Sequence, residues 1–181
     1  DPSELGTLRS RGFNPVAFAW PMPVALSLFD RHGSLAKAWN GAFVGRHTPK
    51  RWDWLWPIQH FKDLLWIAGG IEGAELSYML NRATMGLHVN IEAAPQFAIQ
   101  RLLIYAACGL PIISDVLTND SVLHPNDHYV AVRTADEFHA AIEALLGDMG
   151  RRNALADAAY HHVRSTWGAS KRVKALVEAV A

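Results

Sequence analysis

The stretch at residues 85–115, MGLHVNIEAAPQFAIQRLLIYAACGLPIISD, indicates which fold this chain adopts. It opens with a short apolar run, GLHV, and closes with an extended run, PIISD, that follows a glycine and a leucine. Between the two runs, apolar residues recur at the helical positions i, i+3, i+4 and i+7, namely Ile99, Leu102, Leu103 and Ala106. A strand, a helix and a second strand in this order form a βαβ unit, and such units build parallel sheets with right-handed crossovers.

The two loops of this unit are the first candidates for ligand binding. Ligands of open parallel sheets bind outside the carboxyl ends of the strands. The loops at residues 90–96 and 115–120 follow the two strands of the unit. Both loops are therefore expected at the ligand-binding edge of the sheet.

Strand and helix patterns alternate from residue 41 to residue 146. Further strands are expected at residues 41–45, 63–68 and 128–132, helices at 49–61, 72–83 and 135–146, and two terminal amphipathic helices at 151–167 and 170–181. At least five strands alternating with helices predict an α/β chain with a Rossmann-like, doubly wound parallel sheet and C-terminal helices. We assign residues 1–39 to a lead-in or linker segment and residues 40–181 to the Rossmann-like domain.

Two of the expected helices carry start signals. Thr48 is an expected N-cap because Pro49 follows it at the first helical position, and Pro57 is expected to interrupt and bend this helix. Thr134, with Glu137 three residues later, has the spacing of a capping box.

The composition excludes several classes of partner. The chain has 17 basic and 17 acidic residues and a formal net charge of zero, so neither nucleic acid nor an anionic membrane surface is an expected partner. No apolar run approaches the roughly 20 residues of a membrane span. The single cysteine, Cys108, excludes an internal disulfide and is expected to be a small buried hydrophobe. A cytoplasmic location is the expectation.

The loop after the first expected strand is a candidate anion site. Its strand ends at Gly45, Arg46 and Lys50 follow, and a helix begins in the same loop. Cations beside a helix N-terminus can hold a phosphate group. The alternative, solvated surface charge, stays open at this point.

Other motifs give no comparable prediction. The chain contains no Walker A sequence and no G-x-S-x-G elbow, and residues 69–73 lack the spacing of a dinucleotide fingerprint. Of the nine histidines, His161 and His162 are adjacent, and neighbours on a helix point in different directions, so no metal site is expected. Trp52, Trp54 and Trp56 are expected to pack on the sheet, with an aromatic stacking site as the alternative.

The runs at residues 86–90 and 101–115 resemble the carboxyl-terminal half of group-1 GT-B glycosyltransferases, most closely the CgeB-like branch. The helix of that branch typically reads R-x-F-E-A-x-A-C-G and precedes a P-x-I-x-[ST]-D-like strand. The resemblance covers roughly residues 41–181 and also includes residues 81–83, 124–127 and 129–132. It implies a Rossmann-like domain that binds a nucleotide-diphosphate sugar, without a metal or other cofactor, opposite an N-terminal acceptor domain that this chain lacks.

The resemblance also implies where the donor would bind. Gly45 and Arg46 match the first-strand loop that approaches the sugar or diphosphate, and Lys50 belongs to the same loop. The loop from Asn90 to the start of the helix matches the site of the distal phosphate and sugar, and Arg101 matches the basic residue of the helix motif.

Two family carboxylates are absent. The helix glutamate that commonly binds the ribose hydroxyls falls at Ile104, and the upstream acid of the E-x7-E pattern falls at Gln96. Isoleucine accepts no hydrogen bond, so ribose recognition is expected to be impaired or rebuilt, and Glu92 is a candidate replacement.

These observations give a hypothesis and an alternative. The hypothesis is a glycosyltransferase donor-binding domain that transfers no sugar as an isolated chain. The alternative is a catalytically degenerate GT-B domain that acts as a binding or scaffold module. A sugar-nucleotide epimerase of the same architecture is a more distant third reading.

Overall fold

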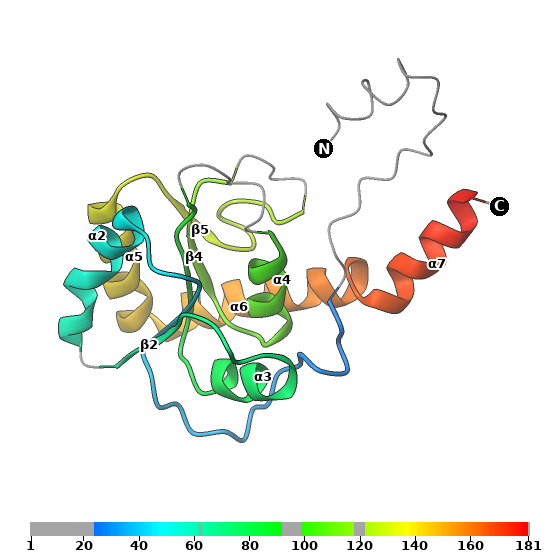
Figure 1. Cartoon of the computed structure of the whole chain (residues 1–181), viewed down its shortest axis with the longest axis horizontal. Helices are drawn as coiled ribbons and strands as arrows, with labels where there is room; N and C mark the ends of the chain where they lie inside the picture. The colour runs from blue at the N-terminus through cyan, green and yellow to red at the C-terminus, as the bar shows by residue number, and fades with distance from the viewer. Residues whose placement is uncertain (1–23, 62, 92–98, 118–121, 181) are drawn as a thin grey trace, which may run out of the picture.

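The computed structural model describes residues 24–61, 63–91, 99–117 and 122–180 of the chain (Figure 1). Within this part, five strands form one parallel sheet, in the spatial order β2 (Leu64–Ile67), β1 (Gly41–Val44), β3 (Gly86–His88), β4 (Ile112–Asp115) and β5 (Val130–Val132). Every pairing in this sheet is parallel. The predicted α/β parallel sheet is confirmed, and the carboxyl ends of all five strands lie at one edge.

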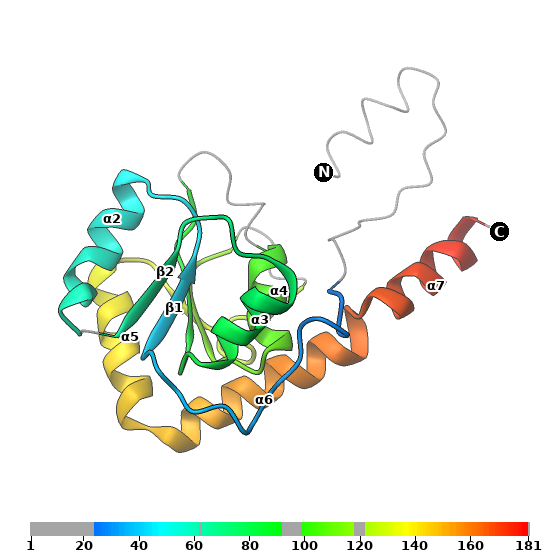
Figure 2. The same cartoon turned by 60° about the horizontal axis from the view of Figure 1, so that its bottom comes forward.

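Helices cover both faces of the sheet. Figures 1 and 2 show α2 and α5 on one side, α3 and α4 on the other, and α6 running beneath α4 toward α7, which projects from the body. Their bounds are α2 (Pro49–Leu55), α3 (Gly73–Asn81), α4 (Ile99–Ala107), α5 (Ala135–Gly147), α6 (Met149–Thr166) and α7 (Ala169–Val180). The two covering layers make this a doubly wound domain.

Alternation along the strands divides the core into two clusters. Ala42 faces the α3 and α4 side, whereas Phe43, the next residue, faces the α2 and α5 side. Ile112 and Ile113 divide in the same way. Because neighbouring residues of a strand point to opposite faces, both faces of a buried parallel strand must be apolar.

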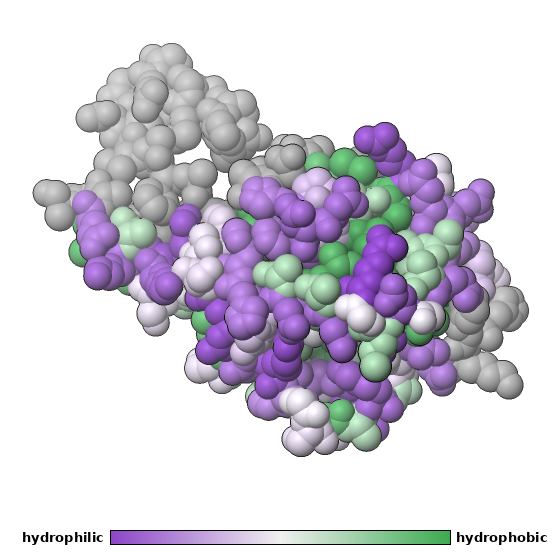
Figure 3. Space-filling model, turned by 180° about the vertical axis from the view of Figure 1, so that it is seen from behind, coloured by the Kyte–Doolittle hydropathy of each residue, from purple (hydrophilic) through white to green (hydrophobic). Residues whose placement is uncertain are grey.

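Seen from behind, the outer surface is mostly hydrophilic, with apolar residues gathered in the half away from α7 (Figure 3).

Tyr105 of α4 joins two neighbouring strands. Its side chain is fully buried, and its hydroxyl accepts a hydrogen bond from Val44 N (2.9 Å) and donates to Leu87 O (3.2 Å). Burial raises the pKa of this phenol to about 12, so it stays neutral. The ring lies over Gly86, where a Cβ atom would come within 2.6 Å of Tyr105 Cδ2. Gly86 therefore lets α4 approach the sheet closely.

Several element boundaries differ from the sequence prediction. The helix expected at 49–61 is α helical only to Leu55 and continues as the 3₁₀ helix η1 (Trp56–Phe61), because Pro57 cannot supply an N–H to the α pattern. Residues 96–98, where the next helix was expected to begin, lie outside the described residues. The helix α6 begins at Met149, two residues earlier than predicted, because the Asp148 carboxylate caps it by accepting from Arg151 N.

The two predicted N-caps are present. Thr48 Oγ1 accepts from Arg51 N at 3.3 Å, and Thr134 Oγ1 accepts from Glu137 N at 3.2 Å. The capping box is incomplete, because the Glu137 carboxylate accepts from Arg133 N in place of the N-cap's own N–H.

Residues 24–40 cross the molecule without a regular helix or strand. They run alongside α6 and α3 before entering β1 (Figure 2). Val24 N donates to Trp167 O at one end of this segment, and Ala38 N donates to Arg82 O near the other. The segment thus begins beside the end of α6 and is joined by backbone hydrogen bonds to the helical layer.

Replacing Gly86 by alanine should destabilise the fold by about 1–3 kcal/mol, because the added methyl group overlaps the buried Tyr105 ring. Urea unfolding followed by circular dichroism measures this change. Gly147→Ala is the matched control, since nothing lies within 4 Å of its added Cβ atom. Equal stability of the two variants would show that α4 does not depend on this close approach.

Candidate functional site

The candidate site lies where β1, β3 and β4 end. The loop after β1 carries Gly45 and Arg46, and Lys50 lies in the first turn of α2, which follows this loop. Asn90 follows β3 closely, and Asp115 is the last residue of β4. Parallel pairing brings these strand ends together. The structure therefore unites loops that are 25 to 65 residues apart in the sequence.

Gly45 shapes the first loop. Its φ of 153° is one that residues with a side chain rarely adopt, and a Cβ atom would lie 3.1 Å from the Arg51 guanidinium. Its N–H donates to Ile67 O, and its carbonyl accepts from Trp66 Nε1, both at 2.8 Å. The edge strand β2 thus holds the loop in place. Arg46, the next residue, is exposed, and no hydrogen bond or ion pair joins its guanidinium to another described residue.

Lys50 and Asn90 meet at the carboxylate of Asp115. Lys50 Nζ lies 2.9 Å from Asp115 Oδ2, and the Asn90 backbone N–H donates to both carboxylate oxygens, at 2.9 and 3.0 Å. The Asp115 side chain is 8% exposed and that of Lys50 is 28% exposed. The ion pair therefore connects the first turn of α2 to the end of β4, and the backbone hydrogen bonds of Asn90 join the residues after β3 to the same carboxylate.

Arg51, the residue after Lys50 in the first turn of α2, is a second cation of this region and is buried. Its Nε donates to Val89 O at 2.8 Å and its Nη1 to Arg46 O at 3.0 Å, while the side chain is 4% exposed. Burial, followed by the nearby Arg101 and Arg46 guanidinium groups, lowers the pKa of Arg51 to about 10, so it stays charged near neutral pH. Through these two hydrogen bonds Arg51 holds the loop after β1 in place, and its buried charge makes the electrostatic potential there more positive.

A buried histidine connects Arg101 to Asn90. His88 Nδ1 lies 3.0 Å from Arg101 Nη1, and His88 Nε2 lies 3.0 Å from Asn90 Oδ1. Because a guanidinium can only donate, Nδ1 is the acceptor and Nε2 carries the proton that reaches Asn90. Burial and the nearby Arg101 lower the pKa of His88 to about 3. His88 is therefore neutral at pH 7 and orients both neighbours.

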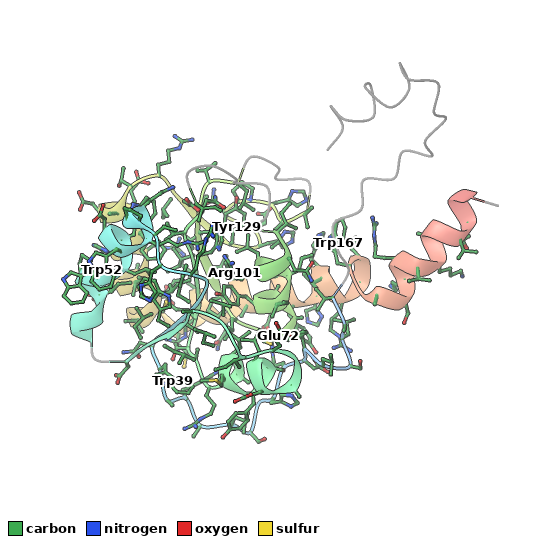
Figure 4. The ribbon with its side chains drawn as sticks, in the orientation of Figure 1. Trp39, Trp52, Glu72, Arg101, Tyr129 and Trp167 are labelled. Atoms are coloured by element: carbon green, nitrogen blue, oxygen red, sulfur yellow. The ribbon has the colours of Figure 1, made fainter. Side chains whose placement is uncertain are left out.

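A cavity of about 190 Å³ opens beside these residues, against α4 and the end of β1. Arg101 and Ile104 line it, together with Gln100, one turn before Ile104. The side-chain oxygen of Gln100 is buried and has no hydrogen-bond partner within the described part of the chain. Figure 4 shows Arg101 on α4 beside the sheet. The cavity therefore offers a cation and an apolar wall, and the unpaired oxygen of Gln100 is buried on the same side of α4.

The structure brings together six of the residues predicted from the sequence. Gly45 shapes the loop after β1, and the other five lie around the strand ends or line the adjacent cavity. The six residues are Gly45, Arg46, Lys50, Asn90, Arg101 and Ile104. The other two, Glu92 and Gln96, lie outside the described residues, so their predicted contribution stays a prediction.

The sequence gives no specific contact for four further residues of this region. It places Asp115 at a strand end, where a candidate ligand loop begins, but predicts no partner for it, and it predicts no role for Arg51, His88 and Gln100. Helical spacing could have indicated Gln100, because it lies four residues before Ile104 and therefore on the same face of α4. The pairing of Asp115 with Lys50 had no local signal, because 65 residues separate the two.

The prediction that three tryptophans pack on the sheet is right for one of them. Trp54 is buried against Phe138, with ring centroids 5.5 Å apart. Trp52 and Trp56 are 40% and 46% exposed and stack on each other at 4.5 Å. Figure 4 shows Trp52 on the outer side of α2. Residues two apart on a helix point in different directions, whereas residues four apart share a face, so Trp54 faces inward while Trp52 and Trp56 lie together on the outer side.

The described residues contain neither a metal-binding cluster nor a membrane-spanning helix. No group of three or more His, Cys, Asp or Glu side chains there is arranged to hold a metal ion. In the same part of the chain, no helix is long and apolar enough to cross a membrane.

The lowered pKa of His88 predicts an acid-sensitive fold. Between pH 6.5, the ordinary histidine value, and about 3, the unfolded chain binds a proton that folded His88 does not, so the free energy of unfolding decreases as the pH falls. His88 alone should change the free energy of unfolding by up to about 1.4 kcal/mol for each pH unit in this range. Urea unfolding at a series of pH values measures the slope. His88→Gln should reduce it, whereas the exposed control His161→Gln should retain it, and the same slope in both variants would contradict the prediction.

Residues 30–178 match the family model described as glycosyl transferase-like. No curated protein matches the chain.

Solved structures of glycosyltransferases share the fold. The C-terminal domain of a group 1 glycosyltransferase, LpcC from Francisella tularensis, has a TM-score of 0.60 at 10% identity, with 81% of this chain and 99% of that chain covered. HepE from Anabaena, solved with UDP and glucose, has a TM-score of 0.69 at 9% identity, covering 87% and 55%. AviGT4, a glycosyltransferase of avilamycin A biosynthesis, has a TM-score of 0.65 at 15% identity, covering 95% and 59%.

The coverage shows that this chain spans little more than half the length of HepE and AviGT4 but nearly all of the LpcC C-terminal domain. At such low identities these likenesses show the fold, a Rossmann-like half of the GT-B type. The family match covers most of the chain, and the chain belongs to the glycosyl transferase-like family.

Proposed function

We propose that this chain is the donor-binding half of a group-1 GT-B glycosyltransferase of the CgeB-like branch. It would bind a nucleotide-diphosphate sugar at the carboxyl ends of β1, β3 and β4. The observation that carries the proposal is the convergence of Arg46, Lys50 and Arg101 around these strand ends, beside a cavity. Similar proteins bind such a donor, since HepE was solved in complex with UDP-glucose. A cytoplasmic location stays a prediction.

The diphosphate would lie against the loop after β1. Arg46 is exposed and has no described side-chain partner, so its guanidinium can form charge-assisted hydrogen bonds with phosphate oxygens. Lys50 has three N–H donors and gives one to Asp115, which leaves two for the ligand. The buried Arg51 adds positive charge without contacting solvent. Stabilisation of the leaving diphosphate is the chemistry that this arrangement supports.

Hydroxyl groups of the donor would enter the cavity beside α4. The family glutamate is absent at Ile104, yet the buried oxygen of Gln100 lies one turn earlier and has no described partner. Because this oxygen is buried, a hydroxyl of the donor would reach and satisfy it only after the Gln100 side chain rotates toward the cavity. We therefore propose Gln100 as the rebuilt hydroxyl acceptor, in addition to Glu92.

Transfer would require a second domain. In the proposed reaction, an acceptor hydroxyl attacks the anomeric carbon and the bond to the diphosphate oxygen breaks. The diphosphate leaves with the bonding electron pair, and the proton of the hydroxyl ends on the released diphosphate or on solvent. The acceptor would be held by an N-terminal domain on the other side of a cleft, as the resemblance implies. The isolated chain should bind the donor and transfer no sugar.

The alternative is a degenerate domain that serves as a binding or scaffold module. Ile104 favours it, because isoleucine accepts no hydrogen bond from a ribose. The ion pair of Lys50 with Asp115 also favours it, because this pair already neutralises one of the cations. The two readings differ in whether a sugar nucleotide binds.

Titration calorimetry with UDP, GDP and their glucose and mannose conjugates should show saturable binding of at least one of them. At about 100 times the dissociation constant, the ligand should stabilise the fold by about 2.7 kcal/mol. The double variant Arg46→Gln, Lys50→Met should lose this binding, whereas the exposed Arg151→Gln should keep it. Absence of binding for every nucleotide would favour the degenerate module.

Restoring the family carboxylate should strengthen binding. The variant Ile104→Glu places an acceptor beside Arg101 and the cavity, so its affinity for the bound nucleotide should rise about tenfold or more. Ile104→Leu, which keeps the side chain apolar, is the control and should leave the affinity unchanged. Equal affinities for the two variants would show that the ribose does not reach this position.

A further inference from the structure

A larger cavity lies at the opposite edge of the sheet. Its volume is about 360 Å³, within the roughly 300–1,000 Å³ of small-molecule pockets. Thr84 and Pro111, which precede β3 and β4, line it, so it opens at the amino ends of the strands. The segment at residues 24–40 and the first turns of α6 form its other walls, and Figure 2 shows these two running side by side.

Three cations from two separate parts of the chain line this cavity. Arg31 and Lys37 come from the segment before β1, and Arg152 comes from α6. Arg31 passes close over Gly109, whose φ of 69° and lack of a side chain leave room for the guanidinium. The three positive groups are thus gathered by tertiary structure around one space.

Two of these cations are not neutralised within the described residues. Lys37 Nζ donates to Asn81 O at 2.9 Å, and Arg152 Nη1 donates to Leu145 O at 3.3 Å, and both acceptors are uncharged carbonyls. The pKa of Lys37 is lowered by partial burial and then by the nearby positive charges of Arg152 and Arg31. Mutual repulsion of this kind is relieved when an anion binds between the groups.

The acidic groups nearby are already engaged. Asp157, which lines the cavity, forms an ion pair with Arg31 at 2.7 Å. Asp30, beside Arg31, accepts from Arg164 and from the Tyr160 hydroxyl, both at 2.8 Å. Neither carboxylate compensates Lys37 or Arg152 by direct contact, so the cavity carries surplus positive charge.

We propose that this cavity binds a small phosphate-bearing anion, either free phosphate or a phosphate monoester. Phosphate is favoured over a carboxylate because it offers three oxygens and up to two negative charges to donors that approach from different elements. Asn153 also lines the cavity and adds an uncharged donor. The site lies at the opposite edge from the proposed donor site, and its existence does not depend on donor binding.

The test is calorimetric titration of the full chain in phosphate-free buffer, with inorganic phosphate in one arm and glycerol 3-phosphate in the other. Saturable binding is expected with at least one of them, and tighter binding of glycerol 3-phosphate would identify a monoester as the ligand. Lys37→Met and Arg152→Gln should each weaken binding about tenfold or more. Arg151→Gln is the matched control, because it removes the neighbouring exposed arginine, which does not line the cavity.

A second comparison separates this site from the donor site. The double variant Arg46→Gln, Lys50→Met should keep the phosphate binding that Lys37→Met and Arg152→Gln weaken, while Arg152→Gln should bind nucleotide like the wild type. Thermal melting of each variant confirms that it is folded. The proposal would be overturned if neither anion showed saturable binding up to tens of millimolar. It would also be overturned if Arg151→Gln and Arg152→Gln weakened anion binding equally.

Discussion

The hydroxyl of Tyr105 is the contact on which both the fold and the candidate site depend. It connects Val44 of β1 to Leu87 of β3 from the buried side of α4. Since α4 also carries Gln100, Arg101 and Ile104, docking of this one ring places all three beside the strand ends. A glycine beneath the ring is the condition for that docking. Packing and site geometry therefore have a common origin.

Charge at the strand ends is arranged by buried groups that themselves need not touch a ligand. Asp115 holds Lys50 and the backbone of Asn90, Arg51 holds the loop after β1, and neutral His88 holds Arg101. Each of these contacts has its own cost of burial, which is offset by hydrogen bonds of good geometry. The result is a cationic edge that is organised before any ligand arrives, which suits the stabilisation of a leaving diphosphate.

The two edges of the sheet carry cations by different means. At the carboxyl edge, the loop after β1 supplies Arg46 and the first turn of α2 supplies Lys50, as expected for a parallel sheet. At the amino edge, Lys37 and Arg152 come from the segment before β1 and from α6, which meet because α6 packs beneath α4. A zero net charge therefore conceals two local concentrations of positive charge.

The amino-acid sequence by itself determined the order of strands and helices, the parallel sheet and the loops that form the candidate site. These follow from apolar spacing and from local start signals such as Thr48 and Thr134, which act over a few residues. Only the tertiary structure decided that Asp115 pairs with Lys50, that Trp52 stays exposed, and that Arg152 faces Lys37. The physical reason is that such contacts join residues far apart in the chain, and periodicity carries no information about which distant side chains will meet.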